Sequence, residues 1–304
     1  MKVVFMGTPD FAVPALEKIA AEHEVVAVFT QPDKPVGRKQ ILTPPNVKVC
    51  AIRLGIPVFQ PKSMKTEESI ELFGSFSPDV AVVAAYGQIL PKAALEVPRL
   101  GCVNIHGSLL PKYRGAAPIQ QAVLDGEKVT GVTTMLMDVG LDTGDILQTA
   151  ETEIGENETS AELFDRLSAL GGELILKTLS ALENGKITPK KQDESLATHT
   201  SKIDKSLCPV DFSKSAREVH NKIRGLYSWP IATAQIGGKR VKIHRARLSD
   251  KKGKAGTILS VRPFVVACGE GSVEILELQP EGKKKMTAEA FAAGHQLKVG
   301  DSII

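Results

Sequence analysis

Hydrophobic positions in the first half of the chain form two patterns. Residues 10–22 repeat apolar side chains with the helical period, as do residues 46–55, 66–76 and 116–125. Short apolar runs rich in β-branched residues predict buried strands at Val3–Met6, Val25–Thr30, Val80–Ala85 and Cys102–His106. Continuous apolar strands that alternate with helices predict a mostly parallel sheet with helices on both faces. The expected fold is therefore α/β, doubly wound and Rossmann-like.

The pattern changes after this region. Two longer strands are expected at residues 129–137 and 145–154, followed by a helix over about 159–184. Residues 186–203 are polar and lack periodicity, which predicts a linker between a first domain at 1–185 and a second at 204–304. The second domain should contain a helix at 213–226 and five short strands, at residues 231–236, 240–246, 255–261, 264–267 and 272–278. Such a series predicts a small all-β barrel of the oligonucleotide-binding (OB) type.

Composition indicates a protein that stays in the cytoplasm, away from membranes. Of the 304 residues, 42% are hydrophobic, yet no run approaches the roughly 18 apolar residues of a membrane span. No export signal is visible at the N-terminus. The four cysteines lie far apart, as expected of reduced, buried thiols, and form no zinc-binding pattern. No sustained apolar seam suggests an obligate dimer, so we expect a monomer.

The net charge of +3 hides an uneven distribution. Residues 1–204 carry 20 Lys and Arg against 26 Asp and Glu, whereas residues 205–304 carry 18 against 9. The second region therefore has a formal charge of +9 and favours a polyanionic partner such as a nucleic acid. The alternative is a basic surface that serves solubility alone.

Candidate chemistry is concentrated at the end of the fourth predicted strand. Asn104 and His106 are two residues apart, so their side chains project from the same face of the strand. The carboxyl ends of parallel strands are where ligands bind in such folds. An amide beside an imidazole can stabilise the oxygen of a carbonyl as it becomes tetrahedral. An isolated Asn-x-His would more often be a histidine that is merely hydrogen-bonded at a strand end.

A second polar stretch, residues 138–145, lies between the two longer strands. Gly140 and Gly144 allow a tight loop that could carry Asp142 over the sheet edge, where its carboxylate could collect the proton of an attacking amine. Ordinary turn chemistry is the alternative explanation for Asp and Gly here. The spacing does not fit a calcium-binding EF-hand loop, and we expect no metal. Because no Gly-x-Gly-x-x-Gly is present, a nicotinamide cofactor such as NAD is not expected either.

Asn104, His106 and Asp142, with the Ser108–Pro111 turn, resemble the catalytic set of the 10-formyltetrahydrofolate-dependent formyltransferases. The resemblance implies that Asn104 and His106 stabilise the formyl oxygen, while Asp142 orients His106 and manages protons. It also implies that Ser108, Leu109, Leu110 and Pro111 border the folate. A non-catalytic RNA-binding module would not need this set.

Two further phrases, residues 7–12 (GTPDFA) and 86–91 (YGQILP), resemble the methionyl-tRNA formyltransferases within that family. So does the basic loop at residues 31–48, which the resemblance makes an insertion that contacts the acceptor stem of methionyl initiator tRNA. It implies tRNA contacts at Arg38 and Lys39 in this loop, and at Lys202 and Lys205 near the linker.

Three assignments compete with this resemblance. A folate-dependent formyltransferase that acts on an amino-sugar nucleotide might keep the second domain but would not require the loop around Arg38. An enzyme that acts on a purine precursor would have little use for residues 205–304, and a dinucleotide-dependent oxidoreductase lacks its glycine motif. Trp229, the single tryptophan, could stack on a base, although burial in the core is the commoner position.

Overall fold

The computed structural model describes residues 1–37 and 39–303, which form two compact units. The first unit comprises residues 1–115, 130–152 and 164–199, and the second comprises residues 116–129, 153–163 and 200–304. The compact units thus interleave along the chain, since two short segments from the middle of the sequence fold with the C-terminal residues.

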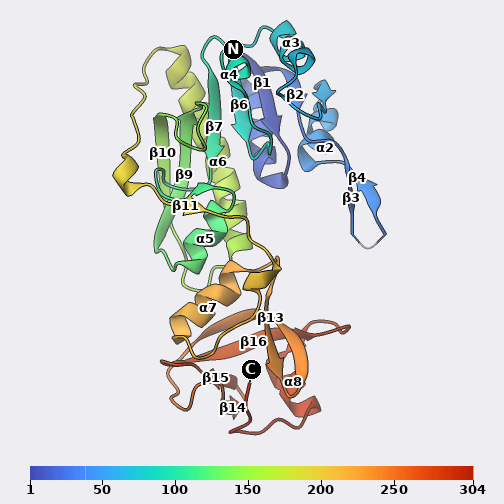
Figure 1. Ribbon diagram of the computed structural model, residues 1–304, viewed down its shortest axis with the longest axis vertical. Coiled ribbons are helices and arrows are strands. Elements are labelled where there is room, and N and C mark those ends of the chain that lie inside the picture. Colours follow the sequence, from blue (N-terminus) through green and yellow to red (C-terminus); the bar gives the residue numbers. More distant parts are fainter. Residues whose placement is uncertain (38, 304) are drawn as a thin grey trace. The chain divides into compact units, whose positions relative to one another are not determined.

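The first unit is built on a seven-stranded sheet in the order β10-β9-β7-β6-β1-β2-β5 (Figure 1). The strands are β1 (Lys2–Gly7), β2 (Glu24–Phe29), β5 (Val58–Phe59), β6 (Val80–Ala84), β7 (Cys102–His106), β9 (Val129–Leu136) and β10 (Ile146–Glu153). Pairing is parallel from β5 through β2, β1 and β6 to β7, and it becomes antiparallel between β7 and β9. The prediction of a mostly parallel sheet is confirmed. The two-residue strand β5 was not predicted because so short a pairing leaves no periodic signal.

Helices of this unit pack their apolar residues on the sheet. They are α1 (Val13–Glu22), which follows the 3-10 turn η1 (Asp10–Ala12), α2 (Asn46–Arg53), α3 (Glu67–Ser75), α4 (Lys92–Leu95) and α6 (Ser160–Glu183). One core cluster gathers Phe29 from β2 and Phe73 from α3, whose rings meet edge to face 5.8 Å apart. Helix α3 begins where it does because the Thr66 hydroxyl accepts a hydrogen bond from the Ser69 amide.

The basic loop at residues 31–48 contains a short hairpin, which the sequence analysis did not predict. Strands β3 (Lys34–Val36) and β4 (Ile41–Thr43) pair antiparallel, and all six of their residues are exposed. Figure 1 shows the pair projecting away from the sheet of the first unit. With both faces in water, the hairpin has no buried side and therefore no apolar alternation by which the sequence could reveal it.

The second unit contains an antiparallel sheet in the order β12-β13-β16-β15-β14, with β17 paired to β16. Its strands are β12 (Ala232–Ile236), β13 (Lys239–Ser249), β14 (Ile258–Val261), β15 (Phe264–Ala267), β16 (Ser272–Pro280) and β17 (Met286–Thr287). Near the C-terminus, Ser302 bridges to Thr257 beside β14 and Ile303 bridges to Ile236 on β12. The chain end therefore joins the two edges of the sheet, consistent with the small barrel that was predicted.

Helices α7 (Ala216–Gly225) and α8 (Ala288–Gly294) pack against this sheet, and α5 (Pro118–Leu124) packs against α7. The expected helix 213–226 starts at residue 216 because Ser215 and Glu218 form a reciprocal capping box. Strand β17 and helix α8 were missed by the sequence analysis.

The remaining general expectations concern cysteines, metals and membranes. All four cysteines are free and buried, and burial raises the pKa of Cys102 to about 12. Within residues 1–37 and 39–303, no three His, Cys, Asp or Glu side chains are grouped so as to hold a metal ion. In the same residues, no helix combines the length and the apolar character that crossing a membrane requires.

Candidate active site

The site is built on the carboxyl end of β7, next to the centre of the sheet. Asn104 pairs with Val83 of β6 on one side and with Met135 of β9 on the other, and His106 pairs with Thr133 of β9. Both side chains are buried, with exposed fractions of 9% for Asn104 and 6% for His106. Because they are two residues apart on one strand, an amide and an imidazole project from the same face at the rim of the sheet.

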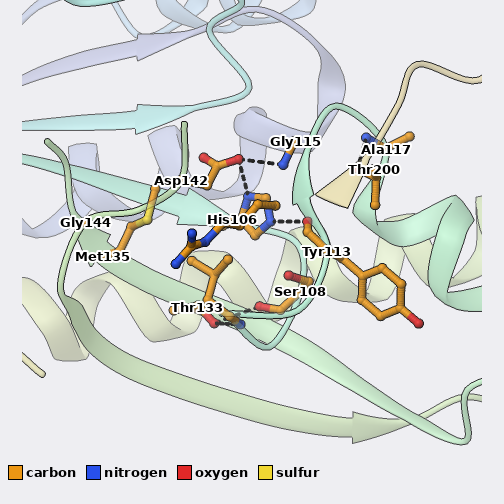
Figure 2. A network of polar contacts seen from close by, with 12 residues as sticks. His106, Ser108, Tyr113, Gly115, Ala117, Thr133, Met135, Asp142, Gly144 and Thr200 are labelled. Atoms are coloured by element: carbon orange, nitrogen blue, oxygen red, sulfur yellow. Dashed lines mark hydrogen bonds and ion pairs between the residues drawn. The ribbon is translucent and has the colours of Figure 1, made fainter. Parts of the chain in front are cut away.

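The ring of His106 has different partners at its two nitrogens (Figure 2). Its Nε2 lies 2.9 Å from the carbonyl oxygen of Tyr113, which can only accept, so Nε2 donates this hydrogen bond. Its Nδ1 lies 3.8 Å from Oδ2 of Asp142. That separation exceeds hydrogen-bond length, so the contact is electrostatic. Nδ1 is therefore the nitrogen that faces the carboxylate.

Asp142 reaches this position on the loop between β9 and β10. Gly144 is required there, since a Cβ on it would lie 1.8 Å from the carbonyl oxygen of Leu136. The Asp138 carboxylate closes the loop by accepting hydrogen bonds from the Gly140 amide at 2.9 Å and the Thr143 hydroxyl at 2.6 Å. The structure thus brings together Asn104, His106 and Asp142 from two separate stretches of the chain.

The Asp142 carboxylate is held in place by the main chain. Its Oδ2 accepts a hydrogen bond of 2.8 Å from the Gly115 amide, the contact seen above His106 in Figure 2. The residue itself adopts a left-handed conformation, with φ at 55°, which aspartate tolerates better than most residues do. The side chain is 14% exposed, so the carboxylate keeps limited access to solvent.

The Ser108–Pro111 turn, the predicted folate border, is rigidly bonded to β9. Thr133 donates its hydroxyl hydrogen to the Ser108 carbonyl at 2.7 Å, and the Thr133 oxygen accepts from the Leu110 amide at 3.1 Å. The Ser108 hydroxyl donates to the Lys112 carbonyl at 2.6 Å, so it is used within the turn. Ser108 and Leu110 are buried, while Leu109 and Pro111 remain partly exposed.

Several residues around the site were missed by the sequence analysis, and most of them lie in the predicted linker. Gln192 donates from Nε2 to the carbonyl oxygens of Asp142 and Gly144, both at 2.8 Å. Arg114, which is 1% exposed, binds the Gln192 oxygen and both oxygens of Glu194. These linker residues gave no sequence signal because they belong to no periodic element. Their polar character is also what a solvated connection would show.

The predicted tRNA contacts occupy different surroundings. Arg38 lies outside the described residues, and Lys39, Lys202 and Lys205 are exposed. Lys48, another cation of the basic loop, lies within hydrogen-bond distance of both oxygens of Asp33, at 2.8 and 2.9 Å, and of the Gln60 oxygen at 2.8 Å. The hydrogen bonds from Lys48 and Gln60 lower the pKa of Asp33. Lys48 therefore braces the base of the hairpin.

In the second unit, basic side chains surround a hollow of about 680 Å³. Its lining includes Lys239, Arg240 and the run Lys283, Lys284, Lys285. Trp229, for which a core position was the commoner expectation, is 55% exposed. That expectation is wrong, because the residue lies in the turn between α7 and β12, outside the apolar cluster of this unit.

Comparison with known proteins agrees with this arrangement. The formyl transferase family model matches residues 1–179, and the model of the formyl transferase C-terminal domain matches residues 202–296. The methionyl-tRNA formyltransferase of Trichlorobacter lovleyi is 50% identical over 302 residues, which cover 98% of this chain and 96% of that protein. The enzyme of the same name from Clostridium novyi is 46% identical over 304 residues, with 98% of each chain covered.

Solved structures share the fold at lower identity. An N-formyltransferase from Helicobacter canadensis superposes with a TM-score of 0.68 at 22% identity, covering 94% of this chain and all of that one. This likeness shows the fold alone. On the family matches and the full-length relatives, the chain belongs to the formyl transferase family and, within it, to the methionyl-tRNA formyltransferases.

Proposed function

We propose that this protein transfers a formyl group from 10-formyltetrahydrofolate to the amino group of methionyl initiator tRNA. The observation that carries the proposal is the meeting of His106 and Asp142, 3.8 Å apart, beside Asn104 at the rim of a parallel sheet. Relatives with 46–50% identity across nearly the whole chain bear the name of this activity.

The reaction is a direct acyl transfer. The neutral α-amine of the methionyl ester attacks the formyl carbon, a new carbon–nitrogen bond forms, and the bond between that carbon and N10 of the folate breaks. The amine loses one proton and N10 gains one, so the step needs no oxidant or reductant. Asn104 donates its amide hydrogen to the formyl oxygen as negative charge develops there.

His106 also stabilises the formyl oxygen, and Asp142 accepts the proton of the amine. Because Nε2 of His106 already donates to the Tyr113 carbonyl, the ring acts on the formyl oxygen through Nδ1. This requires hydrogen on both nitrogens, and the Asp142 carboxylate supplies the counter-charge beside Nδ1. The same carboxylate, 14% exposed, collects the proton of the amine directly or through one water molecule.

The donor is assigned to the space in front of the Ser108–Pro111 turn. The partly exposed side chains of Leu109 and Pro111 offer it an apolar border, and the hydrogen bonds of Thr133 keep the turn fixed. Among the structural neighbours, the Helicobacter canadensis enzyme was solved with folinic acid, and HypX from Aquifex aeolicus was solved with tetrahydrofolic acid.

The tRNA is assigned to the basic surfaces of the chain. Its contacts are the hairpin loop with Arg38 and Lys39, the end of the connection with Lys202 and the nearby Lys205, and the basic hollow of the second unit. We assign residues 1–185 to catalysis, residues 186–203 to the connection, and residues 204–304 to tRNA binding. The protein acts as a cytoplasmic monomer.

The direct test offers the purified protein three acceptors together with 10-formyltetrahydrofolate. These are methionyl initiator tRNA, methionyl elongator tRNA, and an amino-sugar nucleotide of the kind bound by the Helicobacter canadensis enzyme, dTDP-3-aminofucose. We expect formylated product with the initiator tRNA and little with the other two. Product from the sugar nucleotide alone would assign the chain to the amino-sugar branch instead.

A further inference from the structure

We infer that Gln192 is a positioning residue for Asp142, and that with Arg114 it forms a clamp that fixes the loop carrying the catalytic carboxylate. The inference rests on the proposed function, because it assigns Gln192 a role in formyl transfer through Asp142. Neither the sequence resemblance nor the family matches point to this residue.

The first half of the clamp is the bond pair between Gln192 and the loop. Its Nε2 group has two hydrogens, and each is donated to a main-chain carbonyl at 2.8 Å, one of Asp142 and one of Gly144. The two carbonyls lie on either side of Thr143, so one amide group holds three consecutive residues. Asp142, with φ at 55°, lies in the left-handed region that non-glycine residues seldom adopt. The two bonds from Gln192 stabilise this conformation.

The second half of the clamp fixes Gln192 itself. Its Oε1 accepts from Nε of Arg114 at 3.1 Å and from Nη2 at 2.8 Å. Guanidinium groups only donate and carbonyls only accept, so the amide can be satisfied in a single orientation, with oxygen toward Arg114 and nitrogen toward the loop. Arg114 is in turn held by Glu194, through Nη1 at 2.9 Å and Nη2 at 2.7 Å.

Asp142 is consequently held from two directions by one short segment. Gly115 binds the carboxylate directly, from its amide to Oδ2 at 2.8 Å. The neighbouring Arg114 holds the main chain of Asp142 through Gln192. Loss of the glutamine leaves the carboxylate bond intact but releases the backbone. The 3.8 Å approach of the carboxylate to His106 then depends on the Gly115 amide and on the bonds within the loop.

Two substitutions separate the halves of the clamp. Gln192→Ala removes both, whereas Gln192→Glu keeps an acceptor for Arg114 and loses the donors to the two loop carbonyls. We expect kcat to fall about tenfold or more in both, with the KM for tRNA changed less than twofold, because a misplacement of about 1 Å can cost up to ~10²-fold. Gln148→Ala, a glutamine of β10 whose side chain bonds Thr178, is the matched control and should keep wild-type kcat.

Non-additivity distinguishes positioning from a general loss of structure. In an Asp142→Asn background, Gln192→Ala should lower kcat by less than about twofold further, because the group it positions is already disabled. A full additional tenfold loss in that background would overturn the inference. So would a Gln192→Glu variant with wild-type kcat, or a raised KM for tRNA at unchanged kcat.

Amide hydrogen exchange tests the clamp without relying on activity. Peptides covering residues 138–145 should exchange faster in Gln192→Ala than in the wild type, and at the wild-type rate in Gln148→Ala. Unchanged exchange in Gln192→Ala would overturn the clamp even if activity fell. If the wild type formed no formylated tRNA, the proposed function would fail, whereas the exchange result would still decide whether Gln192 fixes the loop.

Discussion

Two glutamines of the first unit fix two loops that are built very differently. Gln192 donates to the carbonyls of Asp142 and Gly144 and accepts from Arg114, a cation that is 1% exposed. Gln60 donates to the Gln31 carbonyl and to Asp33, and accepts from Lys48. Each side chain links a cation on one side to a loop on the other.

The two loops differ in what surrounds them. The loop bound by Gln192 carries Asp142, whose carboxylate lies beside the buried side chain of His106 and accepts a hydrogen bond from the Gly115 amide. The loop bound by Gln60 carries the hairpin formed by β3 and β4, whose paired residues are all exposed. A reacting carboxylate must be held within a fraction of an ångström, whereas cations that meet phosphates act over longer distances and tolerate motion. The comparison therefore predicts losses in kcat at one loop and in tRNA affinity at the other.

The largest effect should come from the catalytic groups. We expect His106→Ala and Asp142→Asn each to lower kcat by ~10²-fold or more, because each removes a group that stabilises charge or moves a proton in the transition state. Affinity for the tRNA, measured separately by filter binding, should stay within about twofold of the wild type. Wild-type turnover in either variant would remove that residue from the mechanism.

The sequence was most informative where periodicity and burial act together. The strand at Cys102–His106 was predicted with the bounds that β7 has, because a short apolar run of this kind is typical of a buried strand, and all five residues of β7 are buried. The alternation of side chains along it placed Asn104 and His106 on one face. Gly140 and Gly144 indicated a tight loop, and the structure gives that loop the Asp142 side chain beside His106.

Residues whose role arises from long-range contacts could not be predicted in this way. Gln192 and Glu194 lie in a polar, aperiodic stretch, and their partner Arg114 is 78 and 80 positions away in the chain. In the sequence, Lys48 is one more cation of a basic loop. In the structure, its ammonium group binds Asp33 and Gln60. Polar side chains in irregular segments carry no period, so only the fold reveals whether they face solvent or a partner.

A smaller effect is expected at the hairpin. Gln60→Ala removes one acceptor of Lys48 and a donor to Asp33, so the hairpin base is ordered less well before tRNA binds. Ordering costs of about 0.5–1.5 kcal/mol per side chain predict a KM for tRNA raised roughly two- to tenfold. The kcat at saturating tRNA should match that of Gln148→Ala. A fall in kcat with unchanged KM would show that both loops serve catalysis. It would contradict the assignment of the Gln60 loop to tRNA affinity.

The smallest expected effect is a response of the hairpin base to pH. Hydrogen bonds from Lys48, and then from Gln60, lower the pKa of Asp33 below its ordinary value of 3.8. A lowered pKa in the folded state means that the carboxylate stabilises the hairpin base above pH ~4 and that this stabilisation is lost as the pH falls through the lowered pKa.

Amide exchange corrected for its intrinsic pH dependence measures this response of the hairpin base. Between pH 5 and pH 3, protection of residues 30–34 should decrease in the wild type, and much less in Asp33→Asn, which has no carboxylate to protonate. Equal loss of protection in Asp33→Asn and the wild type would assign the acid response to another group. Protonation of Asp33 would then not be what loosens the hairpin base.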